Sequence, residues 1–273
     1  MALTTITGTA GSNDAATIRG TSGSDDISLD TSTTNLFVGA QASADSINIG
    51  NSQSSASNYT IKGGNGIDTL LSNSTTTNLA DSFVNLNKGN DVSDLHTLST
   101  STFFGGAGSD TVSFDTLSSS KFNGNKDKDT VTVANASSSS IFGGKGTDNI
   151  AVRGTISSSI INGNLDADTI TLVNGAAITS TTFNGNEGND GITISSISSF
   201  TNSSILGGQG NDTIDGTNSA VALVLSGNDD NDTVDGGSAG DTLSGDAGND
   251  NVDGNAGTDT ITGVGGNDSL DGG

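Results

Sequence analysis

Aspartates recur along this chain directly behind short runs of glycine. The pattern Gly-Gly-x-Gly-x-Asp-x-apolar occurs in full at 63–70, 105–112, 143–150 and 207–214. Near the C-terminus the aspartates repeat every nine residues, at Asp232, Asp241, Asp250, Asp259 and Asp268. Each unit supplies one carboxylate and a turn of backbone carbonyls, so stacked units would surround a hard cation with oxygen ligands.

The candidate metal ligands are the aspartates at the sixth position of the unit and the glycines at its first position. Up to Asp232 the aspartates are mostly 19 to 23 residues apart, which fits two nonapeptides of which only one keeps the motif. The coil at 83–95 is ambiguous, because the anchor pair is either Asn90 with Val92 or Asp91 with Ser93 and neither pair fits the motif cleanly. The candidates are Asp25, Asp45, Gly63, Asp68, Gly105, Asp110, Asp129, Gly143, Asp148, Asp168, Asp190, Gly207, Asp212, Asp232, Asp241, Asp250, Asp259 and Asp268.

Apolar residues at fixed offsets from this motif predict the strands that hold it. One column lies two residues before the first glycine and includes Ile18, Phe37, Ile61 and Phe103, and another lies two residues after the aspartate. A spacing of two indicates a strand with one buried face. Each coil is therefore predicted to run turn, strand, serine-rich second turn, strand.

The residue types in the glycine turn favour a fixed backbone conformation. Positions 2 and 4 are almost always Gly, Asn or Asp, the residues that adopt left-handed backbone at little cost. Ala239 and Val264 are the exceptions in the terminal array, so less regular turns are expected there.

The oxygen-only donor set favours calcium, which accepts six to eight oxygens in flexible geometry, over magnesium, which requires a tight octahedron. The motif resembles the GGxGxDxUx nonapeptide of the RTX family of secreted calcium-binding β-roll proteins. The resemblance extends over nearly the whole chain from residue 18 and implies calcium as the bound cofactor. It does not fix a function, because such arrays occur in toxins, proteases, lipases, epimerases, adhesins and S-layer proteins.

Composition excludes several classes of protein. The 273 residues carry 31 acidic and 8 basic side chains, a net charge of −23, and no cysteine, so disulfides and thiolate metal sites are excluded. The charge argues against nucleic acid and anionic membranes as direct partners, and no run is long enough to insert into a membrane. Without bound cations such a polar, anionic chain would not offset its backbone entropy.

Two lone residues and the serine-rich edge give no enzymatic signature. His96 and Tyr59 have no evident partners in the sequence, and the chain is interpreted as non-enzymatic. The serine-rich turns are interpreted as a solvated edge. An ice-binding face would need a regular threonine array, whereas position 3 of the motif is irregular.

We therefore expect an all-β chain folded as a right-handed parallel β-roll, or β-solenoid, stabilised by calcium, with about twelve to fourteen coils. The expected division is an N-terminal cap at 1–17, a β-roll with one calcium motif per coil at 18–231, and a regular nonapeptide β-roll at 232–273. The array stops without a terminal cap, so the chain is interpreted as part of a longer protein.

The best-supported function is a non-enzymatic, calcium-dependent structural module of a secreted or cell-surface bacterial protein. The chain most resembles RTX-rich S-layer and motility-associated surface proteins, including cyanobacterial ones, which implies an extracellular location and type I secretion. Alternatives are a folding and export module of a larger secreted enzyme or toxin, and an adhesin for glycan or ice. Besides calcium, the expected partners are a second copy, a neighbouring surface protein, or lipopolysaccharide or another glycan.

Overall fold

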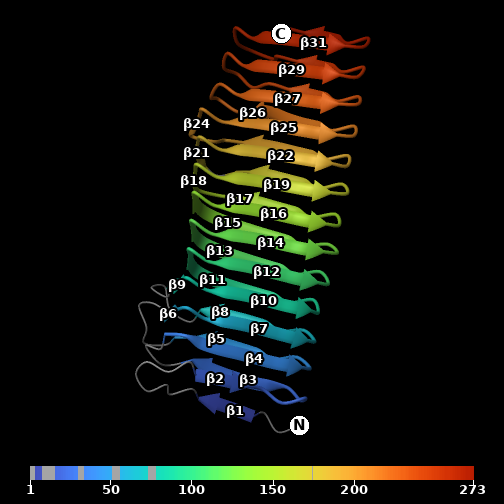
Figure 1. Ribbon diagram of the computed structural model, residues 1–273. Helices are drawn as coiled ribbons and strands as arrows, with labels where there is room; N and C mark the ends of the chain where they lie inside the picture. Colours follow the sequence, from blue (N-terminus) through green and yellow to red (C-terminus); the bar gives the residue numbers. More distant parts are fainter. Residues whose placement is uncertain (1–3, 8–15, 30–33, 51–55, 73–77, 174) are drawn as a thin grey trace. The chain divides into compact units, whose positions relative to one another are not determined.

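The computed structural model describes residues 4–7, 16–29, 34–50, 56–72, 78–173 and 175–273. Within these ranges every element of regular secondary structure is a β-strand, which confirms the all-β expectation (Figure 1). A membrane-crossing helix is accordingly absent from the described residues. The chain divides into two compact units, Met1–Val131 and Thr132–Gly273, called unit 1 and unit 2.

The strands of unit 1 form two parallel sheets. The entry sheet contains the strands that lead into the glycine turns, and the exit sheet contains the strands that leave them. The entry sheet comprises β2 (Ala16–Arg19), β4 (Leu36–Ala42), β7 (Thr60–Asn65), β10 (Phe83–Lys88), β12 (Thr102–Ala107) and β14 (Lys121–Lys126), paired in that order. The exit sheet comprises β1 (Thr4–Thr7), β3 (Asp25–Leu29), β5 (Ser46–Ile49), β6 (Ala56–Ser57), β8 (Thr69–Ser72), β9 (Asn78–Ala80), β11 (Val92–Ser99) and β13 (Thr111–Ser118).

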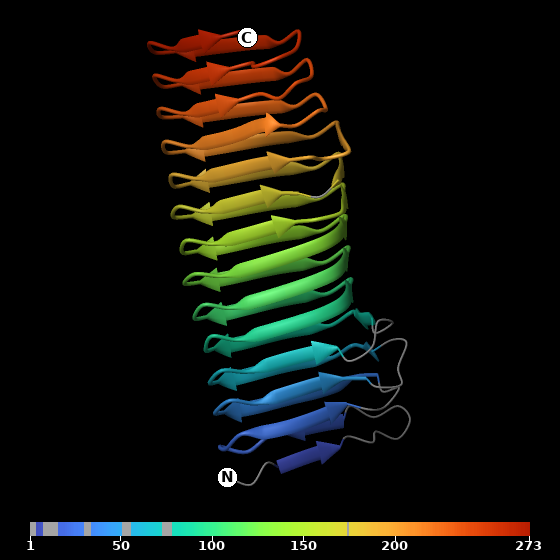
Figure 2. The same ribbon diagram turned by 180° about the vertical axis from the view of Figure 1, so that it is seen from behind.

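Unit 2 repeats the same two-sheet arrangement (Figure 2). Its entry sheet comprises β16 (Ser140–Lys145), β19 (Ile160–Leu165), β22 (Thr182–Glu187), β25 (Ser204–Gln209), β27 (Val224–Asp229), β29 (Thr242–Ala247) and β31 (Thr260–Gly265). Its exit sheet comprises β15 (Thr130–Ser137, of which the first two residues belong to unit 1), β17 (Asn149–Val152), β18 (Thr155–Ser157), β20 (Thr169–Leu172), β21 (Ala177–Thr179), β23 (Gly191–Ser195), β24 (Ser199–Thr201), β26 (Thr213–Asn218), β28 (Thr233–Asp235), β30 (Asn251–Asp253) and β32 (Ser269–Asp271). All pairings are parallel, so the expected parallel β-roll is confirmed.

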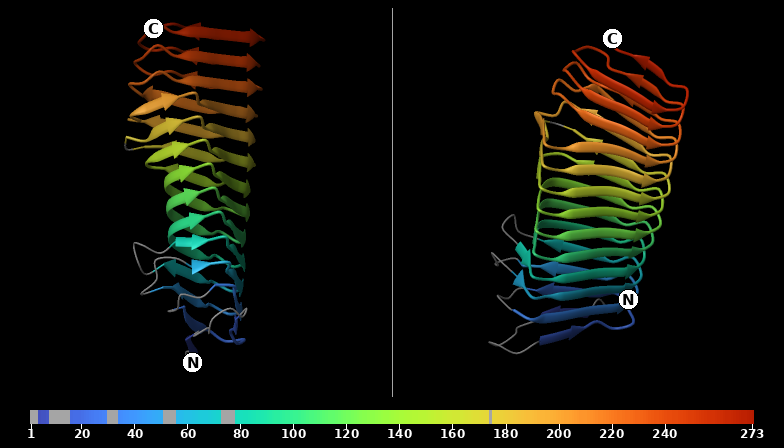
Figure 3. Two further views of the ribbon diagram at one scale, coloured as in Figure 1. Left: turned by 60° about the vertical axis from the view of Figure 1, so that its left-hand side comes forward. Right: turned by 45° about the horizontal axis from the view of Figure 1, so that its top comes forward.

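The core of each unit is the narrow space between its two sheets (Figure 3). Inward residues alternate with outward ones along every strand, as the period of two requires. In unit 2, Ile161 and Phe183 face inward from the entry sheet and Ile170 and Ile192 from the exit sheet, all fully buried. In unit 1 the same columns bring Phe103, Phe114 and Phe122 together, with ring centroids 5.5–5.7 Å apart.

The prediction that Phe37 belongs to the inward apolar column is wrong. Val38, and not Phe37, aligns with Ile18 and Ile61 and is fully buried, so Phe37 lies on the outer face of the entry sheet. The first position of this turn is Ala40 and not Gly39, and this shifts the column by one residue. A shift of one residue in a strand reverses the face of every side chain.

Candidate metal site

The predicted aspartates form a hydrogen-bonded ladder along the glycine-turn edge of each unit. The backbone N–H of each aspartate donates to Oδ1 of the aspartate one coil later, over 2.7–3.1 Å. In unit 1 the ladder joins Asp25, Asp45, Asp68, Asp91, Asp110 and Asp129. In unit 2 it joins Asp148, Asp168, Asp190, Asp212, Asp232, Asp250 and Asp268.

In nine aspartates of these ladders the second carboxylate oxygen has no hydrogen-bond donor. Oδ2 is buried and accepts no hydrogen bond in Asp45, Asp68, Asp91, Asp110, Asp168, Asp190, Asp212, Asp232 and Asp250. A buried oxygen of this kind costs free energy unless something positive contacts it. One such oxygen occurs in coil after coil, and this regularity is what a column of cation sites would require.

The glycine at the first turn position makes room beside this oxygen. A Cβ on Gly105 would lie 2.5 Å from Oδ2 of Asp110 and 2.9 Å from the carbonyl oxygen of Gly124 in the next coil. Gly63 is in the same position relative to Asp68, and its Cβ would also meet the carbonyl oxygen of Leu86. A side chain is excluded here because the carboxylate oxygen and the next coil's carbonyl converge on the same point.

In most turns the second and fourth positions have the predicted left-handed backbone. Gly64 and Gly66 have φ of 119° and 131°, and Asn164 and Asp166 have φ of 89° and 75° at the equivalent positions. Val264 adopts φ of 78°, an unfavourable conformation for a β-branched residue, whereas Ala239 does not adopt positive φ. The less regular turn is therefore the one at Ala239.

Backbone carbonyls must complete any metal site here. No group of three or more His, Cys, Asp or Glu side chains that could hold an ion occurs in the described part of the chain. One carboxylate per coil with several carbonyls is a donor set for calcium, which accepts many oxygens at flexible distances. The ligands would be the aspartate Oδ2 atoms and the turn carbonyls beside them.

Burial controls the charge of the column. It raises the pKa of Asp68, Asp91, Asp110, Asp212 and Asp232 to about 7, that of Asp168 to about 8 and that of Asp190 to about 6. The hydrogen bond from the preceding coil's N–H lowers each pKa, and neighbouring aspartates raise most of them again. A bound cation would offset this cost, because an opposite charge favours the ionised carboxylate.

The ambiguous coil contributes Asp91, which the sequence did not select. Asp91 donates to Asp110 and accepts from Asp68, and Ser93 takes the inward position between Leu70 and Val112. The first turn position of this coil is the buried Leu86, so the glycine that identifies the other units is absent. The sequence signal that could have identified Asp91 is its spacing, 23 residues after Asp68 and 19 residues before Asp110.

Two of the predicted aspartates use Oδ2 differently. Oδ2 of Asp25 accepts the N–H of Thr21 at 2.5 Å, and Oδ2 of Asp241 accepts the N–H of Gly237 at 2.7 Å. Each is the first aspartate of its column, and each satisfies its second oxygen within its own turn. Along the second edge, Leu223 donates to Asp241 and Asp241 donates to Asp259, whose Oδ2 has no donor.

The serine-rich edge is more ordered than the expected solvated edge. One hydroxyl residue per coil is buried, and the N–H of one coil donates to the hydroxyl of the next, as in the aspartate ladder. In unit 1 this ladder joins Tyr59, Ser82, Ser101 and Ser120, and in unit 2 Ser139, Ser159, Thr181 and Ser203. In the second turn of the coil, the uncharged hydroxyl thus takes the position that the carboxylate takes in the glycine turn.

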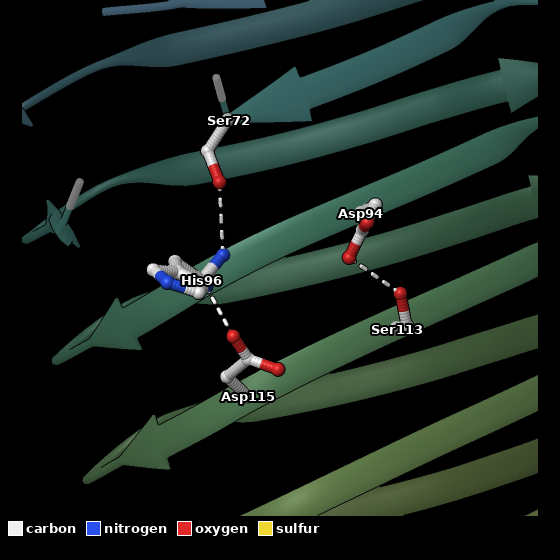
Figure 4. Close-up of polar contacts among 5 residues, drawn as sticks. All are labelled: Ser72, Asp94, His96, Ser113 and Asp115. Atoms are coloured by element: carbon white, nitrogen blue, oxygen red, sulfur yellow. Dashed lines mark hydrogen bonds and ion pairs between the residues drawn. The ribbon is translucent and has the colours of Figure 1, made fainter. Parts of the chain in front are cut away.

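His96 has partners, contrary to the expectation that it stands alone (Figure 4). Its Nδ1 contacts Oδ2 of Asp115 on the next strand, and its backbone N–H donates to Oγ of Ser72 at 2.9 Å. The serine therefore meets the backbone and not the imidazole, so these three residues lack the contact that activates a nucleophilic serine. Tyr59 is buried, and its backbone N–H donates to Ser82.

Comparisons with known proteins agree with this geometry. A family model described as the RTX calcium-binding nonapeptide repeat matches residues 201–219, 226–261 and 253–273. A search among curated proteins gives no match. The fold is similar to the crystal structure of a hyperactive, Ca2+-dependent, β-helical antifreeze protein from an Antarctic bacterium, with a TM-score of 0.67 and 18% identity over 96% of this chain and 86% of that one. Residues 201–219 and 226–273 therefore match the RTX calcium-binding nonapeptide repeat, and calcium is the ion that these repeats bind. The similar structure shows that the fold is a β-solenoid.

Proposed function

We propose that this chain is a non-enzymatic, calcium-dependent structural module of a secreted or cell-surface bacterial protein, similar in role to S-layer proteins. The observation that supports this best is the column of buried Oδ2 atoms without donors. Such a column makes the folded state depend on calcium, and millimolar calcium is found outside cells. A chain built in this way would fold after export, for which type I secretion is the proposed route.

The proposed division of the chain follows the ladders. Residues 18–231 would carry calcium along one edge and residues 232–273 along both, with 1–17 as a cap. Most of the proposed cap lies outside the described residues. Asp241 and Asp259 on the second edge support the two-sided end.

Two alternative functions are separable from this proposal. A folding and export module of a larger enzyme or toxin would have the same ladders, and a catalytic domain in the full-length gene would favour it. Ice binding is attractive because the similar structure is an antifreeze protein. Against it, position 3 of the motif in unit 2 begins with Lys145, Leu165, Glu187, Gln209, Asp229 and Ala247, which is not a regular ice-matching array.

Fractionation of the native host cells tests the proposal. The protein should be found at the cell surface or in the medium, and chelation of calcium should release it and make it protease-sensitive. The matched control is the same wash with calcium restored. Retention in the cytoplasm, or protease resistance that chelation does not change, would contradict the proposed role.

A further inference from the structure

The two sheets of unit 1 carry opposite charge. The entry-sheet strands β2, β4, β7, β10, β12 and β14 contain five basic residues and no acidic ones. The described exit-sheet strands contain Asp25, Asp26, Asp94 and Asp115 and no lysine or arginine. The entry sheet of unit 1 is therefore a basic face on a chain whose net charge is −23. We define the basic face by Arg19, Lys62, Lys88, Lys121 and Lys126, all of which are exposed.

A groove crosses the basic face at its first coils. Its lining includes Arg19, Phe37, Gln41, Lys62, Asn87 and Lys88. The guanidinium carbon of Arg19 lies 5.5 Å from the ring centroid of Phe37, which holds the cation over an aromatic surface. The side chains of Arg19, Lys62 and Lys88 contact no carboxylate within the described ranges. They are thus available to an anion from outside.

The positive charges are regularly spaced across the strands. Arg19 and Lys62 share one register line, with the strand of Gly39 between them. Lys88 and Lys126 share another, with the strand of Ala107 between them. Because neighbouring strands lie about 4.8 Å apart, each pair of charges is about 10 Å apart along the stacking direction. Repeated charges on parallel lines match a linear polyanion better than a single small ion.

Aromatic rings and amides complete the chemistry of this face. Phe37, Phe83 and Phe104 lie on the outer side of the entry sheet, and the rings of Phe83 and Phe104 meet edge to face at 5.7 Å. Aromatic rings present flat apolar surfaces. The side-chain NH2 groups of Gln41 and Asn87 already donate to the carbonyl oxygens of Gly20 and Asn85, so each amide offers a ligand its second N–H and its oxygen. A ligand that satisfies all three groups has acidic groups, hydroxyls and apolar ring faces.

We propose that the basic face of unit 1 binds an acidic polysaccharide along the groove of Arg19, Phe37, Lys62 and Lys88. Its carboxylate, sulfate or phosphate groups would meet the arginine and lysines, its hydroxyls the amides and its sugar rings the phenylalanines. This goes beyond the structural role, because it assigns a ligand to a sheet face and does not involve the calcium edge or the serine edge. It requires only that the chain is folded in calcium.

Other anionic partners fit this face less well. The net charge of −23 opposes every polyanion at longer range, and it opposes nucleic acid, with a phosphate on every nucleotide, more than a polysaccharide such as hyaluronan, with one carboxylate per disaccharide. A second copy could offer the acidic residues Glu187, Asp229 and Asp246, which line a groove on the entry sheet of unit 2. That surface lacks aromatic residues to match Phe37 and Phe83, so a second copy would leave the rings unpaired.

The test is binding of the full chain, in buffered calcium, to immobilised polysaccharides. The probes are hyaluronan, which carries carboxylates, heparin, which also carries sulfates, and neutral dextran; single-stranded DNA is the nucleic acid arm. We expect binding to hyaluronan or heparin, none to dextran, and weaker binding as salt screens the charges. Comparing hyaluronan with heparin identifies which acidic group is preferred.

Variants locate the site. Lys62→Gln and Lys88→Gln should each weaken binding about three- to fivefold, as expected for the loss of one exposed charge contact. Phe37→Leu tests the ring without changing charge and should also weaken binding. Arg153→Gln is the matched control, since it removes one exposed positive charge from unit 2 and should change nothing. Circular dichroism in calcium verifies that each variant is folded.

Three results would overturn the proposal. The first is a folded wild-type chain that binds neither acidic polysaccharide, and the second is equal loss of binding in Arg153→Gln and Lys62→Gln. The third is a preference for DNA, or self-association in sedimentation that Lys62→Gln abolishes, because the partner would then be nucleic acid or a second copy. Failure of calcium-dependent folding would show separately in the dichroism spectra and would refute the structural role instead.

Discussion

The backbone N–H of Asp190 donates a 2.7 Å hydrogen bond to Oδ1 of Asp212 in the next coil, while Oδ2 of Asp190 is buried without a donor. One oxygen of this carboxylate pair therefore joins neighbouring coils, and the Oδ2 atom of Asp190 is the proposed ligand of a cation. Because coil stacking and the proposed metal site share these residues, the two should be lost together when either is disturbed.

Substitution of Asp212 by asparagine separates the two roles of the carboxylate. Asp212→Asn keeps an oxygen to accept the N–H of Asp190 but replaces the charged Oδ2 with an amide. We expect the variant to need more calcium to become β-rich and to lose about 1–3 kcal/mol of stability in calcium. Calcium titration followed by circular dichroism measures this. Asp229→Asn, which removes an exposed aspartate, should match the wild type; equal calcium requirements for all three proteins would refute the assignment.

Two glycines in neighbouring coils should respond differently to alanine. A Cβ on Gly207 would lie 2.6 Å from the carbonyl oxygen of Gly227 and would collide with Oδ2 of Asp212, whereas the nearest atom to a Cβ on Gly191 is 3.9 Å away. Gly207→Ala should lower stability by about 1–3 kcal/mol. Gly191→Ala should be neutral or stabilising by up to about 1 kcal/mol, because it restricts the unfolded chain. Thermal melts in calcium compare them, and equal losses would show that the cradle is misplaced.

A serine on the opposite edge, such as Ser139, would not serve as a neutral control for a glycine-turn variant such as Gly146→Val. Ser139 looks like a solvated residue on the opposite edge, but it is only 3% exposed and belongs to the hydroxyl ladder. Its replacement by valine would remove a hydroxyl that donates to the carbonyl oxygen of Ser137. Both variants would therefore be destabilised, and the comparison would not isolate the turn.

The metal-free chain should become more ordered as the pH falls. Burial raises the folded-state pKa of Asp68, Asp110 and Asp212 to about 7 and of Asp168 to about 8, above the usual aspartate value of about 3.9. Between these values the folded state binds more protons than the unfolded one, so its stability falls as pH rises through about 4 to 8.

Circular dichroism of the chain dialysed free of calcium should thus show more β-structure near pH 5 than near pH 8. In calcium, the β-structure near pH 5 should no longer exceed that near pH 8, because protons compete with the cation for the same carboxylates. A metal-free chain that is equally disordered at both pH values would contradict the raised pKa values.

The sequence predicts the fold because the repeat appears in two independent patterns. The glycine turn and the apolar period of two agree in nearly every coil, so the parallel roll, its core columns and the aspartate edge follow from them. The two patterns disagree in coils where another residue stands at the first glycine position. Leu86 stands there in the coil of Asp91, so the motif does not point to Asp91. Ala40 stands there in an earlier coil, so the sequence predicts Phe37 as the inward residue in place of Val38.

Tertiary features without a residue signature could not be predicted. The buried hydroxyl ladder is one serine among several in each turn, and only the backbone conformation decides which serine turns inward. The residue before it has left-handed backbone, as at Ser119 with φ of 49° and Ser158 with φ of 50°. The basic face has a similar origin, because residues far apart in sequence, such as Arg19 and Lys88, line one groove only after the coils are stacked.

Three aspartates that are cross-strand neighbours in the exit sheet of unit 2, outside both ladders, should destabilise that sheet. Asp235 pairs directly with Asp215 and Asp253 on neighbouring strands, and its pKa is raised by burial and then by both of these charges. Like charges directly opposite one another destabilise a sheet. Asp235→Asn should therefore stabilise the calcium-loaded chain by about 0.5 kcal/mol at neutral pH, with no gain at acidic pH.

The matched comparison is Asp232→Asn, three residues earlier in the same coil. Asp232 belongs to the ladder, so its substitution should destabilise the chain where that of Asp235 stabilises it. Melting curves in calcium distinguish the two. A loss of stability in both variants would mean that the three cross-strand aspartates also bind a cation.

Calcium should lie in a single file through the body of unit 2 and on both edges only near its end. On the first edge the Oδ2 atoms of Asp168, Asp190, Asp212 and Asp232 lack donors. On the second edge the hydroxyl of Ser159 already donates to the carbonyl oxygen of Ser157 at 2.8 Å, and the hydroxyl carries no charge to hold an ion. Asp259 restores a buried carboxylate oxygen without a donor on that edge.

Anomalous scattering from crystals grown in calcium would show the ions directly. We expect a continuous file beside the first-edge aspartates and a second-edge ion beside Asp259, which Asp259→Ser should remove without affecting the first file. Ser203→Asp is the reciprocal variant, and it should gain no ion, because its turn lacks the paired glycines that open the cradle in the other turns. Ions between the serine turns of the wild type would contradict the one-sided ladder, since they would require ligands that the hydroxyl column does not supply.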